Sequence, residues 1–317
     1  MEKPKIVTIV GPTATGKSAL GIHLAQKFHG EIINADSMQI YRGLDIGTAK
    51  PSPEDQALVR HHLIDILDLK ETYSAARFRE DADQIIKIRH KDKIPIFVVG
   101  GTGLYLKVLT KGIFHGPEAN LELRQKLKKR LAQEGSQVLH KELQSLDPDA
   151  ASKIHPRDHL RIIRALEVVY QTNRSLSSLH REHGFQEQPY QVLKIGLSLA
   201  KEELFNRIEI RIEEMFRKGW IEEVKNLLAQ GYSPEIKPFQ AIGYKQIIMY
   251  LNGQIDLAEM VRLIRRKTKA YAKRQITWFK ADPEINWFYA SVENWPQIEN
   301  MVESFLFGST NSDLKNP

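Results

Sequence analysis

The sequence predicts an α/β protein with a parallel sheet and a helical insertion. Over the first hundred residues, short apolar runs alternate with segments of helical periodicity, which is typical of a parallel sheet. From about residue 117 the β-branched runs stop and helices rich in Leu, Lys and Arg follow, until a strand pattern returns near Val192. We therefore expect an α/β core of residues 1–116 and 192–317, helical in its C-terminal part, and an insertion domain of residues 117–191.

The individual elements follow from apolar periodicity and from turn residues. Strands are expected at residues 6–10, 31–35, 62–67, 94–99 and 192–199. Helices are expected at residues 19–28, after a cap at Ser74, at 202–218 and at 261–280. After residue 200 the pattern indicates helices almost to the C-terminus, with no further strand.

Composition excludes several classes of protein. The 317 residues contain no cysteine, which excludes disulfides, cysteine-ligated zinc, iron–sulfur clusters and thiol catalysis. No apolar run approaches the roughly 18–20 residues of a membrane span, and the N-terminus lacks the apolar core of a signal peptide. We expect a soluble cytoplasmic monomer with no membrane partner. The net charge of +7 favours an anionic partner.

The clearest motif is a P-loop between the first expected strand and the first expected helix. It consists of Gly11, Pro12, Thr13, Ala14, Thr15, Gly16, Lys17 and Ser18. Its glycines let backbone N–H groups surround a phosphate at a helix N-terminus, Lys17 neutralises the phosphate, and Ser18 can hold Mg²⁺. The motif predicts a P-loop NTPase-like core that binds a diphosphate or a triphosphate.

The acid that holds Mg²⁺ in P-loop NTPases is missing from its usual place. The strand at 94–99 ends in a glycine turn that contains Thr102 and no carboxylate, whereas the strand at 31–35 is followed by Asp36. Both positions lie at the carboxyl edge of the expected sheet, where ligands bind. Asp36 is therefore a candidate metal ligand or general base, with a helix cap as the alternative. Thr102 is a candidate ligand contact or a plain turn hydroxyl.

Arg211 interrupts an apolar pattern. The expected helix at 202–218 carries an apolar stripe, and at 100° per residue Arg211 falls inside it. A buried guanidinium is costly unless an anion meets it. Arg211 is therefore a candidate phosphate contact, with a core ion pair as the alternative. Arg207, one turn earlier, is expected to be structural or at the rim of the site.

Three basic runs indicate a nucleic-acid partner, although each run alone is consistent with a solvated surface. The helix at 261–280 has eight Lys and Arg residues and no acid, and its charged face includes Arg266, Lys269 and Lys273. The other two runs lie in the insertion, around Arg124 and around Arg161. The eleven histidines show no metal-site spacing.

Taken together, the motifs resemble the bacterial tRNA dimethylallyltransferases (tRNA isopentenyltransferases). The matching stretches are GPTATGKS (11–18), ADSMQIYRGLDIGTAKP (35–51), IPIFVVGGTGLY (94–105), HPRDHLRIIRALEV (155–168), AIGYKQ (241–246) and AKRQITWF (272–279). They cover most of the chain in the order of the family.

The resemblance implies transfer of a dimethylallyl group from dimethylallyl diphosphate to the N6 amine of the adenosine 3′ of the tRNA anticodon, with Mg²⁺ as cofactor. The P-loop would hold the diphosphate, Asp36 would take the amine proton, and Thr102 and Arg211 would contact the diphosphate. The insertion would grip the anticodon stem-loop. Positions that match tRNA-contacting positions are Asp36, Ser37, Met38, Gln39, Thr102, Arg124, Leu160, Arg161, Ile162, Ile163, Arg164, Gln240, Ala241, Ile242, Gly243, Tyr244 and Lys245.

Some features separate this chain from relatives, and two other functions stay open. Leu160 and Ile163 stand where polar residues can occur in the family, and the zinc finger of eukaryotic relatives is absent. The P-loop alone is also consistent with a kinase of a small metabolite. A nucleic-acid-stimulated ATPase is a further alternative, but it would need a Walker-type acid.

Overall fold

The computed structural model describes residues 2–114, 116–117, 120–184 and 187–308. The chain divides into two compact units, each described here by itself. Unit 1 comprises residues 1–110 and 189–317, and unit 2 comprises residues 111–188. The insertion predicted at 117–191 therefore corresponds to unit 2, with boundaries a few residues earlier in the chain.

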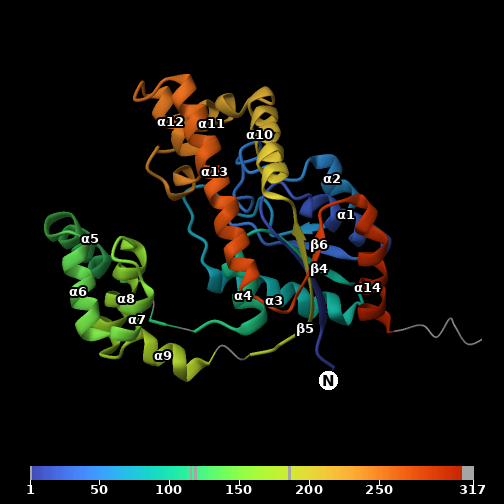
Figure 1. Cartoon of the computed structure of the whole chain (residues 1–317), viewed down its shortest axis with the longest axis horizontal. Helices are drawn as coiled ribbons and strands as arrows, with labels where there is room; N and C mark the ends of the chain where they lie inside the picture. The colour runs from blue at the N-terminus through green and yellow to red at the C-terminus, as the bar shows by residue number, and fades with distance from the viewer. Residues whose placement is uncertain (1, 115, 118–119, 185–186, 309–317) are drawn as a thin grey trace, which may run out of the picture. The chain divides into compact units, whose positions relative to one another are not determined.

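Within the described residues, unit 1 contains a six-stranded sheet in which all neighbouring strands are parallel, in the order β3-β2-β4-β1-β5-β6 (Figure 1). The strands are β1 (Lys5–Val10), β2 (Glu31–Asn34), β3 (His61–His62), β4 (Ile96–Val99), β5 (Gln191–Ser198) and β6 (Ile285–Tyr289). The parallel sheet and the P-loop position after β1 confirm the predicted fold class.

Two of the strand predictions were wrong. The extended segment expected at 62–67 is a two-residue strand followed by turns, because Leu63 and Asp65 have φ angles of 60° and 54° that a strand cannot contain. The edge strand β6 was not expected at all. It has five residues and pairs with β5 on one side only, so its alternation is too short to stand out after a long helical pattern.

The helices of unit 1 connect and cover these strands. They are α1 (Lys17–Lys27), α2 (Pro53–Leu58), α3 (Ala75–Lys91), α4 (Gly103–Lys111), α10 (Lys201–Arg217), α11 (Trp220–Ala229), α12 (Tyr244–Leu251), α13 (Leu257–Lys280) and α14 (Trp295–Phe307), with short 3₁₀ turns at Lys237–Gln240 and Val292–Asn294. Ser74 caps α3 by accepting a hydrogen bond from the backbone N–H of Arg77 at 3.1 Å, as predicted. α10 and α13 run side by side (Figure 1) and are joined by ion pairs from Arg265 and Lys269 to Glu209.

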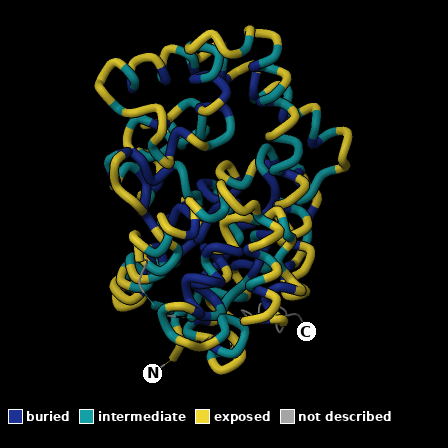
Figure 2. The backbone as a smooth tube through the Cα atoms, turned by 90° about the vertical axis from the view of Figure 1, so that its left-hand side faces the viewer, coloured by how far each residue is buried: buried dark blue, intermediate teal, exposed yellow. Residues whose placement is uncertain are grey.

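The core of unit 1 explains why the P-loop is rigidly placed. Apolar side chains of β1, β4 and β5 pack with those of α1 and α14 on one face of the sheet, among them Val7, Leu20, Val99 and Ile298. β1 and β4 are buried over most of their length, and Figure 2 shows buried backbone, in dark blue, in the interior of the molecule. Strands buried on both faces are typical of parallel sheets. The loop between β1 and α1 is thus held between two buried elements.

Unit 2 is a small helical unit. Its helices are α5 (Leu121–Glu134), α6 (Ser136–Leu146), α7 (Pro148–Lys153), α8 (His159–Thr172) and α9 (Leu176–His183). Asp147 accepts a hydrogen bond from the N–H of Ala150 and Pro148 occupies the first helical position, so α7 begins directly after Asp147. Leu127, Leu139, Leu143 and Ile162 form its core.

No helix in the described part of the chain is both long enough and apolar enough to cross a membrane.

Candidate active site

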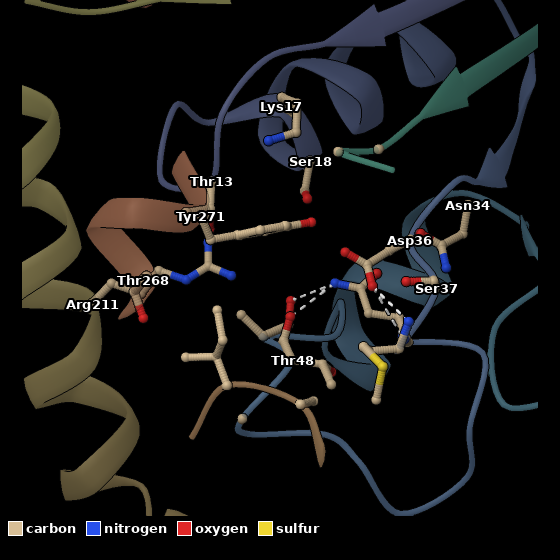
Figure 3. Close-up of a pocket in the computed structure, with 18 of the residues that line it drawn as sticks. Thr13, Lys17, Ser18, Asn34, Asp36, Ser37, Thr48, Arg211, Thr268 and Tyr271 are labelled. Carbon is tan, nitrogen blue, oxygen red and sulfur yellow. Dashed lines mark hydrogen bonds between the residues drawn. The ribbon is translucent and has the colours of Figure 1, made fainter. Parts of the chain in front are cut away.

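A cavity of about 380 Å³ lies in unit 1 at the carboxyl ends of β1, β2 and β4 (Figure 3). Ligands bind at this edge in open α/β sheets. Its walls come from the P-loop, the segment after β2, the glycine turn after β4, the buried face of α10, the turn before α12 and the middle of α13. The cavity therefore joins segments that are far apart in the sequence.

The P-loop is shaped by its glycines and by its own hydrogen bonds. Gly11 has a φ of 141°, and a Cβ atom there would lie 2.5 Å from the carbonyl oxygen of Leu197, so only glycine fits. The carbonyl oxygen of Pro12 accepts hydrogen bonds from Thr15 Oγ1 at 2.9 Å and from Lys17 Nζ at 2.7 Å. These bonds close the loop on itself.

Lys17 lies in this cavity, and no carboxylate of the described residues pairs with it. The pKa of Lys17 is lowered to about 7, first by burial and then by the positive charge of Arg211, while Asp36 acts to raise it. Its ammonium group donates to a neutral carbonyl, which does not balance the charge. A bound anion would restore the pKa of Lys17 and hold the lysine charged.

Arg211 faces the same space from α10, beside Ile208 and Ile212 (Figure 3). No described residue forms a hydrogen bond or an ion pair with it, so the alternative of a core ion pair is wrong. Burial lowers the pKa of Arg211, and Asp36 and Glu214 act to raise it. Arg207 differs: its Nη2 donates to Glu203 at 2.8 Å and to the carbonyl oxygen of Ala290 at 3.4 Å.

Asp36 lies at the end of β2 and lines the cavity opposite these cations (Figure 3). Its Oδ1 accepts hydrogen bonds from the backbone N–H groups of Met38 at 2.8 Å and Gln39 at 3.3 Å. No described residue donates to Oδ2. The carboxylate therefore organises a turn with one oxygen and keeps the other available. No helix follows, so it is not a helix cap.

The residues after Asp36 form a wall of the cavity rather than a surface loop. Ser37, Met38 and Gln39 all line it. The side chain of Gln39 is buried, and its Nε2 donates to the carbonyl oxygens of Thr48 and Ala49, each at 3.1 Å. Gln39 thus joins two stretches of this wall, and its side chain has little left to offer a ligand.

Thr102 holds the segment of Asp36 in place. Its Oγ1 accepts a hydrogen bond from the backbone N–H of Ser37 at 3.1 Å, next to the glycine turn that lines the cavity. The hydroxyl keeps its own O–H as a donor, and its contact with a ligand stays a prediction.

The stretch from Gln240 to Lys245 divides into two parts. Gln240, Ala241 and Ile242 line the cavity, and Lys245 is exposed on α12. Gly243 and Tyr244 are buried, and a Cβ atom at Gly243 would lie 1.8 Å from the ring of Trp220. Tyr244 also lines the cavity, so its predicted contact with tRNA stays a prediction, whereas Gly243 packs closely against Trp220.

Three residues of this region were missed by the sequence analysis. Tyr271 of α13 lines the cavity, and burial raises its pKa. Gln275, one turn later, accepts a hydrogen bond from the N–H of Thr13 at 2.9 Å and donates one to the carbonyl oxygen of Gly101 at 3.0 Å. A polar residue on the otherwise apolar side of a basic helix was the available signal.

The third missed residue is Glu223 of α11. Its Oε2 accepts hydrogen bonds from the backbone N–H groups of Asp45 at 3.0 Å and Ile46 at 2.6 Å. Its Oε1 accepts from Gly47 at 3.3 Å and from Tyr244 Oη at 2.7 Å. One carboxylate thus fixes the loop that supplies Gly47, and nothing in the sequence connects two segments about 180 residues apart.

The basic residues of α13 differ in what they contact. Lys269 Nζ pairs with Glu209 at 2.5 Å and lies 5.3 Å from the centre of the Phe205 ring. Lys273 Nζ lies 5.5 Å from the same ring, and both Lys273 and Arg266 are exposed. Two of the three predicted tRNA contacts on α13 are therefore exposed cations, whereas the charge of Lys269 is balanced within the protein.

In unit 2 the predicted contacts also divide. Arg124 makes two bonds to Glu167, from Nε at 2.8 Å and from Nη2 at 2.9 Å, and Arg164 Nη1 makes a third at 2.7 Å. Leu160 is 78% exposed, and the side chain of Arg161 is 65% exposed. Leu160 and Arg161 can meet a partner directly, whereas Arg124 and Arg164 are bound to a buried carboxylate.

Ile162 and Ile163 are 0% and 6% exposed and belong to the core of unit 2. The prediction that these two side chains contact tRNA is wrong, because the segment 160–164 is helical and only one side of a helix faces outward.

Comparison with known proteins identifies the family. A family model described as IPP transferase matches residues 39–282. The tRNA dimethylallyltransferase 2 of Geotalea uraniireducens is 49% identical over 305 residues, which is 96% of this chain and 98% of that protein. The tRNA dimethylallyltransferase of Geobacter sulfurreducens is 48% identical over 286 residues, 90% of this chain and 92% of that protein.

Comparison with solved structures indicates the same family. The full-length tRNA isopentenylpyrophosphate transferase of Bacillus halodurans is 38% identical with a TM-score of 0.72, covering 96% of this chain and 97% of that one. A eukaryotic dimethylallyltransferase acting on tRNA is 28% identical with a TM-score of 0.82, covering 99% and 82%. With this identity over nearly the full length, and a P-loop cavity at the expected edge of the sheet, the chain belongs to the tRNA dimethylallyltransferase (IPP transferase) family.

Proposed function

We propose that this protein transfers the dimethylallyl group of dimethylallyl diphosphate to the N6 amine of the adenosine 3′ of a tRNA anticodon and releases diphosphate. One observation carries the proposal. Lys17 and Arg211, which pair with no carboxylate in the described part of the chain, share one cavity with Asp36, whose Oδ2 accepts no hydrogen bond from those residues. This is the charge pattern that an anionic leaving group and an amine that loses a proton require.

The cations act on the leaving group. As the C1–O bond of the allylic diphosphate breaks, the electron pair and the negative charge pass to the diphosphate oxygen. Lys17, Arg211 and the backbone N–H groups of the P-loop are fixed before the reaction and stabilise that charge where it develops. Preorganised stabilisation of this kind is usually the largest contribution to catalysis.

Asp36 acts on the nucleophile. The N6 nitrogen forms a bond to C1 of the allyl group and then carries an extra proton, which the carboxylate of Asp36 accepts. The two backbone N–H groups of Met38 and Gln39 keep the carboxylate in place through Oδ1, so Oδ2 serves as the base. General base catalysis typically contributes about 10²–10⁴-fold.

The adenine must leave its stack to reach a cavity lined by buried strands, which costs a few kcal/mol. Around the cavity, the segments 36–38 and 240–242 offer the polar and apolar contacts for the extruded base. Exposed Lys245, Arg266, Lys273, Leu160 and Arg161 are proposed to contact the anticodon stem-loop. All groups needed for the chemistry lie in a single chain, so the proposal requires no second copy.

The residues present fit Mg²⁺ if the diphosphate shares its coordination. Ser18 places a hydroxyl in the cavity, and the described residues contain no cluster of three or more His, Asp or Glu side chains that could hold a metal by itself. Mg²⁺ is commonly held by one or two protein oxygens together with phosphate oxygens and water. Ser18 would hold the ion, which when bound neutralises charge on the diphosphate.

A mass measurement tests the proposal. The protein is incubated with tRNA, dimethylallyl diphosphate and Mg²⁺, and the nucleosides are analysed after digestion. We expect a gain of about 68 Da on one adenosine, the mass of C₅H₈, with one diphosphate released per group transferred. Absence of this product, or ATP consumption in its place, would favour the kinase or the ATPase.

The variant Asp36→Asn tests the base. It keeps the acceptor oxygen for Met38 and Gln39 but cannot take a proton at neutral pH, so kcat should fall by about 10²-fold or more. Affinity for tRNA and for diphosphate should change little. The matched control Asp45→Asn alters an exposed carboxylate on the 44–49 loop, outside the cavity. Unchanged turnover in Asp36→Asn would remove Asp36 from this role.

A further inference from the structure

We propose that Gln275 is a positioning residue that holds the P-loop in the shape that binds diphosphate. The inference deepens the proposed function and rests on it. The side-chain amide of Gln275 makes two hydrogen bonds, one to each of two loops: Oε1 accepts from the N–H of Thr13 at 2.9 Å, and Nε2 donates to the carbonyl oxygen of Gly101 at 3.0 Å. It thereby joins the P-loop after β1 to the glycine turn after β4.

The described residues show no other side-chain hydrogen bond between the P-loop and a segment outside it. The two remaining side-chain bonds of the loop, from Thr15 and Lys17, end on Pro12 within the loop itself. The position of the P-loop at Thr13 relative to the glycine turn after β4 therefore depends on Gln275. Gln275 is 6% exposed and lies on α13, an element that follows the P-loop by more than 200 residues.

The amide lies close against the turn after β4. A Cβ atom on Gly101 would lie 2.2 Å from Gln275 Nε2, so a side chain at 101 would displace the amide. An amide is the side chain that presents one acceptor and one pair of donors in a plane. Neither a carboxylate nor an apolar side chain of the same length can serve both a backbone N–H and a backbone C=O.

The P-loop binds an anion through N–H groups that must already point into the cavity. If Gln275 is lost, the N–H of Thr13 and the carbonyl of Gly101 lose their partners inside the protein, and both loops are free to move to recover them. A displacement of about 1 Å at a binding site can cost about 10²-fold. We therefore expect diphosphate affinity to fall by about 10- to 100-fold, with tRNA affinity unchanged.

Two substitutions test this. Gln275→Met keeps the length and loses both hydrogen bonds. Gln275→Glu can keep both when the new carboxyl is protonated, because it then has one acceptor and one O–H donor, and it loses the bond to Gly101 when it ionises. The matched control Thr277→Ala lies on the same helix, is exposed, and bonds only to the carbonyl oxygen of Lys273.

The measurement is the Kd of inorganic diphosphate with constant Mg²⁺, by calorimetry between pH 5 and pH 8, always as the ratio of variant to wild type. The ratio cancels the titration of the diphosphate itself. We expect a ratio of about 10–100 for Gln275→Met at every pH and near 1 for Thr277→Ala. For Gln275→Glu the ratio should be large at pH 8 and fall as the pH is lowered.

The outcomes separate the hypotheses. A ratio within twofold for Gln275→Met overturns the inference, and so does an equal loss of tRNA affinity, which would indicate a general structural role. If Gln275→Met does not fold, the pH dependence of Gln275→Glu decides, and a flat ratio overturns the inference. If wild type does not bind diphosphate at all, the proposed function fails together with this inference. Intact wild-type binding with an unaffected Gln275→Met removes this inference alone.

Discussion

The cations of the unit 1 cavity and the arginines of unit 2 are alike in sequence but differ in what they face. Among the residues that the structure describes, no carboxylate bonds to Arg211, which lines the cavity, and Lys17 donates only to a carbonyl oxygen. Arg124 and Arg164 both bind Glu167, which has no exposed surface. A cation whose charge is unbalanced within the protein can bind an anion, whereas a balanced one stabilises the fold. The number of basic residues in a segment does not distinguish the two.

The sharpest test of this comparison uses two arginines one turn apart on α10. Arg211→Gln should lower kcat/KM by about 10²–10³-fold, because it removes charge stabilisation of the leaving group. Arg207→Gln should change kcat/KM by less than about threefold, because Arg207 already pairs with Glu203. Steady-state kinetics with dimethylallyl diphosphate as the varied substrate provide the measurement. Equal losses would show that position on the helix, rather than a missing partner, marks a functional arginine.

In unit 2 we expect the loss of a balanced ion pair to reduce the stability of the fold and not the turnover. Glu167→Gln leaves two arginines without their shared carboxylate, and we expect it to lower the free energy of unfolding by about 2–4 kcal/mol, since the arginines still reach solvent. Turnover of the folded enzyme at saturating tRNA should be retained. Urea unfolding provides the measurement, with the exposed Glu182→Gln as control. A change below about 0.5 kcal/mol would mean that the cluster contributes little to folding.

The cluster of Glu167, Arg124 and Arg164 also predicts that the stability of the fold decreases at acidic pH. Burial acts to raise the pKa of Glu167, but the hydrogen bonds from Arg124 and Arg164 outweigh it and leave the pKa lowered. A lowered folded-state pKa means that the unfolded state binds the proton more readily. The stability from Glu167 is therefore present above the ordinary carboxyl pKa of 4.5 and is lost as the pH falls below it. In Glu167→Gln this part of the acid dependence should be absent.

The lowered pKa of Lys17 predicts that the protein takes up a proton when diphosphate binds. Its pKa of about 7 means that it is mostly neutral in the free enzyme at pH 8, and a bound diphosphate favours the charged form. We expect up to one proton to be taken up per diphosphate at pH 8, and fewer at pH 6. Calorimetry in two buffers of different ionisation enthalpy measures it. Lys17→Arg, which stays charged, should show about one proton less than wild type at pH 8, and equal uptake would contradict the lowered pKa.

The smallest of the expected effects concerns the salt dependence of tRNA affinity and comes from the exposed cations of α13. Replacing exposed Arg266 and Lys273 with Gln should reduce the slope of log affinity for tRNA against log salt by about one to two units, at roughly 0.7–0.9 per phosphate contact. Lys269→Gln should reduce it less, because Lys269 already pairs with Glu209. Filter binding over a salt series provides the measurement. If Lys269→Gln has the larger effect, pairing within the protein does not predict which cations meet RNA.

Local patterns predicted those parts of the fold that depend on local sequence. The P-loop, the strands that flank it and the Ser74 cap of α3 depend on adjacent residues, and they lie where expected. β6 was missed because an edge strand of five residues is defined by its pairing with β5, about 90 residues away. The prediction of an extended segment after His62 was wrong because Leu63 and Asp65 adopt positive φ angles, and no glycine at these positions indicates this in the sequence.

The site was predicted to a similar extent. Asp36, Lys17 and Arg211 could be found because each residue type is unusual for its position in a strand end, a loop or an apolar stripe. Gln275 and Glu223 could not, since their roles are bonds to backbone groups of distant segments. Arg124 was expected to contact tRNA, and its pairing with Glu167, which lies 43 residues away, was not expected. The periodicity of a helix indicates on which side of it a residue lies, but it does not indicate which distant residue contacts the side chain.

Glu223 has a consequence for how this enzyme could change its substrate. The carboxylate holds the 45–47 loop through main-chain N–H groups, so it recognises the course of the backbone and not the identity of the side chains. Among these three positions only Gly47 is restricted, because a Cβ atom there would lie 2.0 Å from Trp220. Thr48 and Ala49, which line the cavity, are held more tightly, because Thr48 Oγ1 donates to the carbonyl oxygen of Leu44 at 2.6 Å and Ala49 has a φ of 48°. Mutations that vary what this wall presents to a nucleotide must therefore keep the backbone path of the loop.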